Sequence, residues 1–520
     1  MNLIDFFDRG VTLCPQRICL TDGERALSYC ETQVYTHRIA LALQARGIGE
    51  GSKVAVYSPN HVMGFLAILG IFRAGAVMVP INAKNILNEN MYILEDTDVE
   101  WLFYHSCFED AVSEIRAQVP SIRGVICLDQ SGKDTSSLDA WCQSFDGQAE
   151  PLVEKPSRLT ILGSTGGTTG HPKGVRSIDR CLETMVASFL THMPCDQPPV
   201  HLLVAPMTHA AGAMAYPLLA LGGAQHFMAE VDPEAIMQMI ERHKVTHLFL
   251  PPTVIYVMLA HPKVRNYDYS SLKYFLYAAA PMSADKLRQA IEIFGPVMVQ
   301  SYGQAEAPMF CTFMFAQDHL EALKPGNEHR LLSCGKTTPF VRLAIMDDDG
   351  NLLERNAHGE IVVRGSLVMG GYYKNPEATE ESRAHGWHHT GDIGTIDDDG
   401  FVFIVDRKKD MIISGGFNVF PSEIEQVIWS HPAVQDCAVI GVPDEKWGEA
   451  VKAVIETVPG NALNKEAIEA EIINLCKAKL GSVKAPKTVD VWESLPRSPV
   501  GKVLKKTIRQ TFWEGRDRSI

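Results

Sequence analysis

Residues 161–174 read ILGSTGGTTGHPKG, an apolar strand end that runs directly into a loop rich in glycine and hydroxyl side chains. Four glycines between residues 164 and 174 let backbone N–H groups approach an anion closely, and four Ser and Thr hydroxyls add further donors. Lys173 brings a positive charge to the same loop. The alternative is an ordinary surface turn, but this density of donors after a buried strand favours a cradle for phosphate groups.

Two common nucleotide-binding motifs do not match the chain. A P-loop requires Gly-Lys-Ser/Thr, whereas Lys173 is followed by Gly174 and Lys502 by Val503. The glycines at positions 47, 49 and 51 come close to a dinucleotide fingerprint, but they follow a helical pattern instead of a strand. A dehydrogenase is therefore disfavoured.

The sequence around the loop alternates short β-branched runs with longer helical patterns, which is typical of parallel strands joined by crossover helices. At 520 residues the chain exceeds the size of one ordinary core, so at least two domains are expected. The expected strands are residues 53–57, 101–104, 124–128, 201–204, 247–250 and 297–300, and the expected helices are residues 63–75, 233–243 and 281–294.

The pattern changes toward the C-terminus. Turn signals at Asp349-Gly350 and Asp399-Gly400 separate expected strands at residues 343–346, 359–364 and 401–405. A compact pattern follows, with helices at residues 421–430 and 465–479 and strands at residues 434–442 and 449–457. We therefore predict an α/β fold whose N-terminal body, residues 1–406, has mostly parallel sheets and a β-rich part from about residue 335. A small, mobile α+β C-terminal domain, residues 407–520, completes the prediction.

Charge and composition restrict the partners. Forty-eight Lys and Arg residues against sixty-two Asp and Glu residues give a net charge of −14, which disfavours nucleic acid and anionic membranes. Two rather apolar stretches, residues 63–81 and 202–224, are interrupted by Arg73 and by His209 with several Gly and Pro residues. Buried elements therefore explain them better than transmembrane segments do.

The cysteines and the N-terminus predict a cytoplasmic protein. Twelve cysteines are scattered without a C-x-x-C pair, so neither a redox dithiol nor a cysteine metal site is expected. The first residues include Asp5 and Asp8 and lack the basic segment that precedes the apolar part of a signal peptide.

The loop and seven further motifs, in the same order along the chain, resemble the adenylate-forming superfamily of acyl-CoA synthetases, luciferases and nonribosomal-peptide adenylation domains. The likeness spans nearly the whole sequence, and the acyl-CoA synthetases are the nearest branch. The seven motifs are Pro206-Met207-Thr208-His209, Ala279-Ala280-Pro281, Tyr302-Gly303-Gln304-Ala305-Glu306, Thr390-Gly391-Asp392, Asp406-Arg407-Lys408-Lys409-Asp410, Gly415-Gly416-Phe417-Asn418, and residues 496–502.

The resemblance implies a reaction in which a carboxylate attacks the α-phosphate of ATP and expels pyrophosphate. Glu306 and Thr165 would ligate Mg²⁺, and Lys502, Glu306 and Lys173 would be the catalytic residues. Asp392 and Arg407 would hold the ribose. The residues implied to bind ATP are Ser164, Thr165, Gly166, Gly167, Thr168, Thr169, Gly170, Lys173, Ala279, Ala280, Pro281, Tyr302, Gly303, Gln304, Ala305, Asp392, Arg407 and Lys502.

A second half-reaction is implied for the C-terminal domain, because Lys502 must withdraw before a thiol can reach the adenylate. Lys409 occupies the position of the family's hinge. After rotation about the hinge, Ser414, Gly415, Gly416 and Phe417 would line the tunnel for coenzyme A.

Two features of the sequence bear on the substrate. Ala305 stands where the family usually has a Thr that touches the α-phosphate, so one hydrogen bond of about 0.5–1.5 kcal/mol is missing or is made through water. Residues 208–214 lack the Asp that pairs with an amino-acid ammonium, which favours an aliphatic or aryl acid without an α-amino group. The implied acyl pocket consists of His209, Met214, Ala278, Gln300, Gly303, Met309 and Phe310.

The leading hypothesis is an acid:CoA ligase that uses ATP, Mg²⁺ and coenzyme A. Trp447-Gly448-Glu449 and residues 484–487 resemble stretches common in acyl-CoA synthetases and favour coenzyme A as the acceptor. An acyl-AMP ligase that loads a carrier-protein thiol, a luciferase-like oxygenase and an inactive nucleotide-binding regulator are the alternatives. The assembly is left open, with a homodimer as one possibility.

Overall fold

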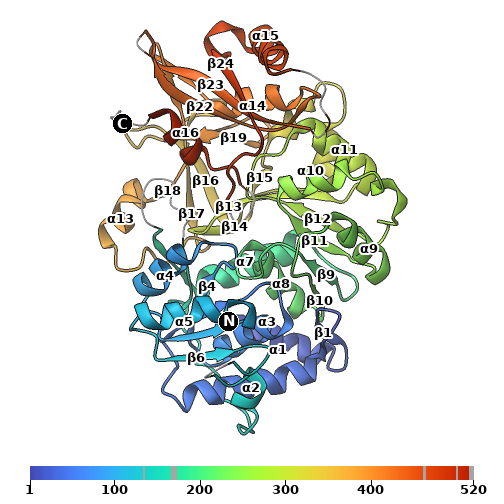
Figure 1. Cartoon of the computed structure of the whole chain (residues 1–520), viewed down its shortest axis with the longest axis vertical. Helices are drawn as coiled ribbons and strands as arrows, with labels where there is room; N and C mark the ends of the chain where they lie inside the picture. Colours follow the sequence, from blue (N-terminus) through green and yellow to red (C-terminus); the bar gives the residue numbers. More distant parts are fainter. Residues whose placement is uncertain are drawn as a thin grey trace.

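The computed structural model describes residues 1–132, 135–164, 172–444, 446–458, 460, 464–498 and 502–513. In Figure 1 the first residues, in blue, lie at the bottom of the molecule and the C-terminal residues, in red, lie at the top. Seven residues of the quoted stretch, 165–171, lie outside the described residues; among them are the predicted ATP-binding residues Thr165, Gly166, Gly167, Thr168, Thr169 and Gly170.

The loop belongs to a sheet whose strand order, in the described chain, is β6-β5-β3-β4-β7-β8. The strands are β3 (Lys53–Tyr57), β4 (Val77–Ile81), β5 (Trp101–Tyr104), β6 (Gly124–Cys127), β7 (Leu159–Ser164) and β8 (Gly174–Ile178). Neighbours are parallel except β7 and β8, which are antiparallel. Val54 and Val56 pack on one face of β3, and Ala55 and Tyr57 pack on the other. Burial on both faces explains the continuous apolar sequence of this strand.

A second, larger sheet has the order β15-β14-β13-β12-β11-β9-β10-β1-β2 within the described residues. Its central six strands, from β13 to β1, are parallel, and antiparallel strands flank them at both edges. The strands are β1 (Ile18–Thr21), β2 (Ala26–Ser28), β9 (Val200–Leu203), β10 (Ala224–Phe227), β11 (His247–Leu250), β12 (Tyr274–Tyr277), β13 (Met298–Gln304), β14 (Ala307–Met314) and β15 (Lys336–Thr337).

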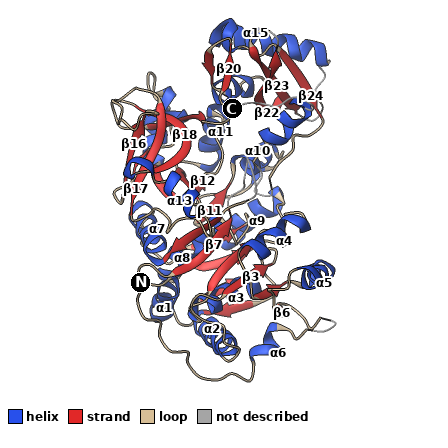
Figure 2. Ribbon diagram, turned by 90° about the vertical axis from the view of Figure 1, so that its left-hand side faces the viewer, coloured by secondary structure: helices blue, strands red, loops and turns tan. Residues whose placement is uncertain are grey.

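Helices fill the space between the two sheets and cover their outer faces (Figure 2). The inner layer contains α1 (Leu3–Leu13), α2 (Tyr29–Gln44), α3 (Val62–Arg73), α7 (Asp179–His192) and α8 (Ala210–Ala220). The helices α9 (Pro233–His243), α10 (Pro252–Ala260) and α11 (Ala284–Phe294) cover the larger sheet, and α4 (Leu87–Asp96) and α5 (Glu109–Gln118) cover the smaller one. Three short helices are α6 (Leu138–Cys142), α12 (Ala316–Ala322) and α13 (Pro376–Glu381).

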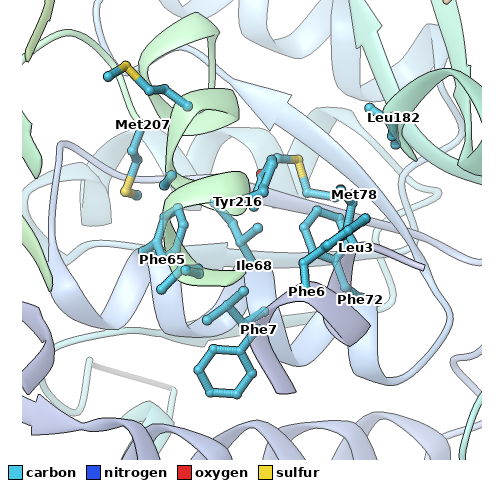
Figure 3. Packing of buried hydrophobic residues seen from close by; sticks show 14 of the residues in the cluster. Leu3, Phe6, Phe7, Phe65, Ile68, Phe72, Met78, Leu182, Met207 and Tyr216 are labelled. Carbon is cyan, nitrogen blue, oxygen red and sulfur yellow. The ribbon is translucent and has the colours of Figure 1, made fainter. Parts of the chain in front are cut away.

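Figure 3 shows the main core in the inner layer, where side chains of α1, α3 and α8 meet. Phe65 of α3 lies against Tyr216 of α8, with ring centroids 6.1 Å apart. Arg73, the charge within the first apolar stretch, is buried at the end of α3 and pairs with Asp8 of α1 at 2.5 Å. It also donates to the hydroxyl of Thr36 at 2.8 Å, so the buried charge is both paired and hydrogen bonded.

None of the helices in the described part of the chain combines the length and the apolar character that crossing a bilayer requires.

Two further sheets complete the fold. One is antiparallel, with the order β16 (Val341–Met346), β17 (Gly359–Gly365), β18 (His388–Ile396) and β19 (Val402–Arg407). The other contains β20 (Ile412–Ser414), β21 (Phe417–Val419), β22 (Val434–Asp444), β23 (Gly448–Thr457) and β24 (Thr488–Trp492). It packs with α14 (Pro421–Trp429), α15 (Lys465–Lys484) and α16 (Lys505–Trp513) at the top of Figure 1.

The α/β class, with mostly parallel sheets, a β-rich part and a C-terminal α+β part, is confirmed. Several element boundaries differ from the prediction by a few residues, and two of them have a local reason in the structure. The helix expected from residue 281 begins at Ala284, because Ala279 has a left-handed φ of 72° and Ser283 keeps extended backbone. The strand expected at residues 297–300 continues to Gln304, because it forms a hairpin with β14.

Candidate active site

The ends of the phosphate loop lie side by side. Ser164 at the end of β7 pairs with Gly174 at the start of β8, so the two strands that flank the loop meet at one point of the sheet. Lys173 precedes β8, and its ammonium lies 5.1 Å from the centre of the Tyr372 ring. A lysine over an aromatic face is attracted by the ring's quadrupole, which orients this loop residue toward Tyr372.

Glu306 lies at the turn between β13 and β14, where Gln304 pairs with Ala307. Its side chain is 8% exposed, and Oε1 accepts a hydrogen bond from the Tyr372 hydroxyl at 2.8 Å. Burial, followed by the charge of Glu306, raises the pKa of Tyr372, so this hydroxyl stays protonated and donates. Tyr372 therefore contacts both Lys173 and Glu306, the two groups predicted to hold phosphate and metal.

Among the described residues, no three His, Cys, Asp or Glu side chains gather closely enough to hold a metal ion by themselves. Glu306 nevertheless offers one carboxylate near the ends of the phosphate loop. Mg²⁺ is commonly bound through one or two carboxylates together with the phosphates of a substrate. The site therefore fits a magnesium ion that arrives with its nucleotide.

Tyr302, Asp392 and Arg407 form one polar group, in which Tyr302 and Asp392 are buried and the Arg407 side chain is 37% exposed. The Tyr302 hydroxyl donates to Asp392 Oδ2 at 2.5 Å, and Arg407 Nε lies 2.6 Å from Oδ1. Asp392 and Arg407 face each other across β18 and β19. Burial raises the pKa of Asp392, against the opposing effects of Arg407 and Tyr302. Each carboxylate oxygen keeps a second lone pair, so each can still accept a hydrogen bond from a ribose hydroxyl.

The predicted adenine residues follow β12 at the carboxyl edge of the parallel strands, next to the end of β13. Ala279 has a left-handed φ of 72°, a conformation that alanine rarely adopts, and it turns the chain before Pro281. Gly303 is required at its position because a Cβ there would lie 2.4 Å from the Met309 backbone nitrogen. Ala305 is exposed at the tip of the hairpin.

Lys502, from the C-terminal part of the chain, lies in the electrostatic environment of Asp392 and Arg407. Its backbone bonds with Ser498 close a small turn, which Arg497 anchors through ion pairs to Asp436 and Glu456. The residue as a whole is exposed to solvent. Partial desolvation of its ammonium by the surrounding protein lowers the pKa of Lys502, and Arg407 lowers the pKa further, whereas Asp392 raises it. Lys502 thus lies within electrostatic range of Asp392, the residue predicted to bind the ribose.

The predicted hinge residue Lys409 belongs to this charge cluster. Burial lowers the pKa of Lys409, and Arg407 lowers it further. It lies between the end of β19 and the start of β20, where the chain passes from one sheet to the other.

The predicted acyl pocket is only partly brought together. His209 lies at the start of α8, where burial lowers its pKa to about 4 and keeps it neutral, and Met214 is buried one turn further on. Ala278 and Met309 are half-buried next to residues predicted to bind the nucleotide, Ala279 and residues 302–305. Gln300 instead accepts a hydrogen bond from Tyr277, and Phe310 lies in the core among Phe189 and other rings. Their role in the pocket stays a prediction.

The turn predicted to meet coenzyme A joins β20 to β21. Ser414 pairs with Phe417, and Gly415 donates to the carbonyl of Trp447. Gly415 and Gly416 have φ values of 59° and 83°, which suit glycine. Phe417 and Trp447 are exposed aromatic side chains on this surface.

The sequence analysis missed Tyr372 and the network behind Asp392. Gln304 donates to the carbonyl of Thr390 and contacts His388, which burial keeps neutral with a pKa lowered to about 4. The signal for Tyr372 was the run Gly370-Gly371-Tyr372-Tyr373, whose glycines allow close backbone approach. No motif that we used connected this run to the loop before β8.

Two protein-family models match the chain, and together they cover most of its length. The family model described as AMP-binding enzyme matches residues 7–373, and the model described as AMP-binding enzyme C-terminal domain matches residues 423–502. The chain belongs to the AMP-binding enzyme family.

Relatives and solved structures match along nearly the whole chain. A medium/long-chain-fatty-acid–CoA ligase of Mycobacterium tuberculosis is 37% identical over 92% of this chain and 84% of its own. A feruloyl-CoA synthase of an Amycolatopsis species is 32% identical over 97% and 98% of the two chains. The structure of ATP-bound MatB from Rhodopseudomonas palustris superimposes with a TM-score of 0.87 and 28% identity, covering 98% and 99% of the two chains.

Proposed function

We propose that this protein is an AMP-forming acid:CoA ligase. The observation that carries the proposal is the convergence of Lys502 with Asp392 and Arg407, which come from separate parts of the chain. The relatives named as fatty-acid–CoA ligase and feruloyl-CoA synthase support the same activity. ATP, Mg²⁺ and coenzyme A are the cofactors and co-substrates of such a ligase.

In the first half-reaction, a carboxylate oxygen of the acid attacks the α-phosphorus of ATP, and the bond to pyrophosphate breaks. Asp392 accepts the ribose hydroxyls, while Lys173 and the donors of the loop neutralise the leaving pyrophosphate. The Lys502 ammonium neutralises charge that develops between the carboxylate and the α-phosphate. Glu306 would hold a magnesium ion, which would supply positive charge beside the phosphates.

In the second half-reaction, the coenzyme A thiol loses its proton and its sulfur attacks the acyl carbonyl. The acyl–phosphate bond breaks and AMP leaves. We propose that the part beyond residue 406 turns about Lys409 between the two steps, so that Ser414, Gly415, Gly416 and Phe417 replace Lys502 at the adenylate. The chain leaves β19 after Arg407 and enters β20 at Ile412, and Lys409 lies in this connection, just beyond the proposed boundary between residues 406 and 407.

The acid is proposed to be aliphatic or aryl and to lack an α-amino group. Residues 208–214 contain no carboxylate that could pair with an ammonium, and Met214 and Ala278 offer apolar surface. Relatives named for fatty acids, ferulate and indoleacetate span this range. His209, neutral because burial lowers its pKa to about 4, adds no charge to the wall.

We also propose a cytoplasmic location, because all twelve cysteines are free thiols, as expected in a reducing compartment. A homodimer stays a prediction that sedimentation analysis tests.

Carboxylate-dependent exchange of labelled pyrophosphate into ATP tests the first half-reaction. We expect exchange with at least one acid in a panel of fatty, phenylpropenoic and aryl acetic acids, and acyl-CoA formation when coenzyme A is added. Transfer to a phosphopantetheinylated carrier protein, with none to coenzyme A, would instead identify a carrier-loading ligase. Absence of exchange with every acid, by protein that still binds ATP, would identify a nucleotide-binding regulator.

A further inference from the structure

Tyr372 connects two groups that belong to different sheets. Its hydroxyl donates to Glu306 at the turn of the larger sheet, and its ring lies under the Lys173 ammonium beside the smaller sheet. In the described residues, Tyr372 is thus in contact with both sides of the predicted phosphate and metal site. Neither contact requires a bound nucleotide.

The backbone around Tyr372 makes the same connection. Met369 N–H donates to the Glu306 carbonyl at 2.7 Å, and Tyr373 N–H donates to the Gly174 carbonyl at 2.7 Å. Tyr372 itself forms an antiparallel bridge with Val175 of β8. The segment of residues 369–373 is therefore fixed to the turn that carries Glu306 and to the strand that follows Lys173.

A hydrogen bond to one oxygen restricts the orientation of a carboxylate. A Glu306 side chain without the Tyr372 bond could turn among its rotamers, and each turn would move its oxygens away from the phosphates. The bond engages Oε1, so it holds the plane of the carboxylate while a second oxygen remains for a metal ion. The lysine over the ring is restrained in the same way.

We propose that Tyr372 is a positioning residue that holds Glu306 and Lys173 in the relative placement needed to bind a magnesium–nucleotide complex. The inference deepens the proposed function and rests on it for the identity of the nucleotide. The expected effect is on the affinity for the metal-bound nucleotide, because the residue acts through Glu306 and Lys173 instead of on the reacting atoms.

The neighbouring residue provides a matched control. The Tyr373 hydroxyl donates to Asp98 at 2.8 Å, and Lys53 lies 5.5 Å from its ring centre. Tyr373→Phe therefore removes the same kind of bond, from a tyrosine that also lies beside a lysine, but away from Glu306. Tyr372→Phe removes the bond to Glu306 and keeps the ring under Lys173.

The test measures binding of a non-hydrolysable ATP analogue by calorimetry, with Mg²⁺ and with EDTA. Tyr372→Phe should weaken binding of the magnesium complex about tenfold, the effect of losing one hydrogen bond to a charged group. The loss should be smaller in EDTA, and Tyr373→Phe should bind as the unmodified protein does. In pyrophosphate exchange, the KM for magnesium–ATP should rise more than kcat falls.

A double-mutant cycle with Glu306→Gln separates positioning from general loss of structure. If Tyr372 acts through Glu306, adding Tyr372→Phe to Glu306→Gln should cause little further loss in binding of the magnesium complex. Equal losses for the Tyr372 and Tyr373 variants, or a loss unchanged by EDTA, would overturn the proposal.

The calorimetric readout needs no substrate acid. If the protein binds the analogue but exchanges no pyrophosphate with any acid, the proposed function fails while the binding effect of Tyr372→Phe still stands.

Discussion

Ala305 is a single position at which this chain differs from the family pattern, and the structure shows what a change there would encounter. The residue is exposed at the tip of the β13–β14 hairpin, beside the buried Glu306. A threonine can therefore be introduced without displacing the core. Its hydroxyl would extend from the hairpin toward the predicted α-phosphate position.

Ala305→Thr is expected to preserve or raise the rate of acyl-AMP formation, by up to about tenfold for one added hydrogen bond. Single-turnover formation of acyl-AMP measures the rate. Ala305→Val is the matched control, because it adds the same branched shape without the hydroxyl and should give no increase. A collapse of the rate in the threonine variant alone would show that the site has been rebuilt around alanine.

Individual residues could be predicted where their chemistry is local. Asp392 follows a recognisable Thr-Gly pair, and the structure places it against Tyr302 and Arg407, two other predicted residues. Tyr372 could not be predicted, because its importance comes from the distant Glu306 and Lys173. Phe310 was expected in the acyl pocket, but its sequence context does not reveal which face of β14 packs against Phe189.

At the level of elements, α16 is held to the rest of the C-terminal part by buried charges. Lys505 lies 2.8 Å from Glu425 of α14, whose side chain is only 5% exposed. Burial alone would lower the pKa of Lys505, but Glu425, Asp406 and Asp410 raise it. Arg509, one turn further along α16, pairs with Asp410 at 3.0 Å.

Lys505→Met should lower the free energy of unfolding by about 3–5 kcal/mol, because it leaves Glu425 buried without its partner. Chemical denaturation followed by fluorescence measures the change. The pKa of Lys505 is raised in the folded state. Its contribution to the free energy of unfolding is therefore complete below the ordinary lysine pKa of about 10.4, and it is lost only as the pH rises through the raised folded-state pKa. The double variant Lys505→Met, Glu425→Leu should regain most of the loss; equal instability would argue against the charge pair.

The elements themselves could largely be predicted from periodicity. The residues expected for β3, β5, β11 and α9 coincide with the observed bounds. Short strands such as β15, β1 and β2 were not predicted, because their few residues carry little pattern and their pairing is decided by neighbours. The length of β13 depended likewise on its hairpin partner.

For the whole molecule, contacts cross the predicted hinge at several points. Ser422 N–H donates to Asp406 at 2.9 Å, and Gln426 of α14 donates to the carbonyl of Met282 at 3.4 Å. On the other side of the hinge, Lys408 contacts Asp348 at 2.6 Å. These contacts belong to an arrangement in which Lys502 lies within electrostatic range of Asp392 and Arg407, as the first half-reaction would require under the proposed function.

Lys502→Ala should therefore separate the two half-reactions. Acyl-AMP formation should fall by at least about a hundredfold, because one group that neutralises transition-state charge is lost. Thioester formation from synthetic acyl-AMP and coenzyme A should stay largely intact, since Lys502 has withdrawn by then. Stopped assays of each step measure the difference. Equal losses in both steps would indicate damage to the fold, and near-normal acyl-AMP formation would remove Lys502 from its assigned role.

The way the sheets are joined could not be predicted from the sequence. Parallel order within each sheet follows from alternating strands and helices, but the bridge between Val175 and Tyr372 joins residues with no shared local pattern. The same holds for β1, which pairs with β10 far along the chain. Such contacts depend on three-dimensional packing, which periodicity alone does not encode.

The segment of residues 369–373 has a consequence for how the protein is made. Synthesis proceeds from the N-terminus, so the glycine-rich loop leaves the ribosome long before residues 369–373, which hydrogen bond to both Gly174 and Glu306. Both parallel sheets can assemble while synthesis continues, but their nucleotide-facing edges are joined only after residue 373 has left the ribosome. A nascent chain arrested earlier should have an incomplete phosphate-binding site. ATP would therefore stabilise the nascent protein only late in translation.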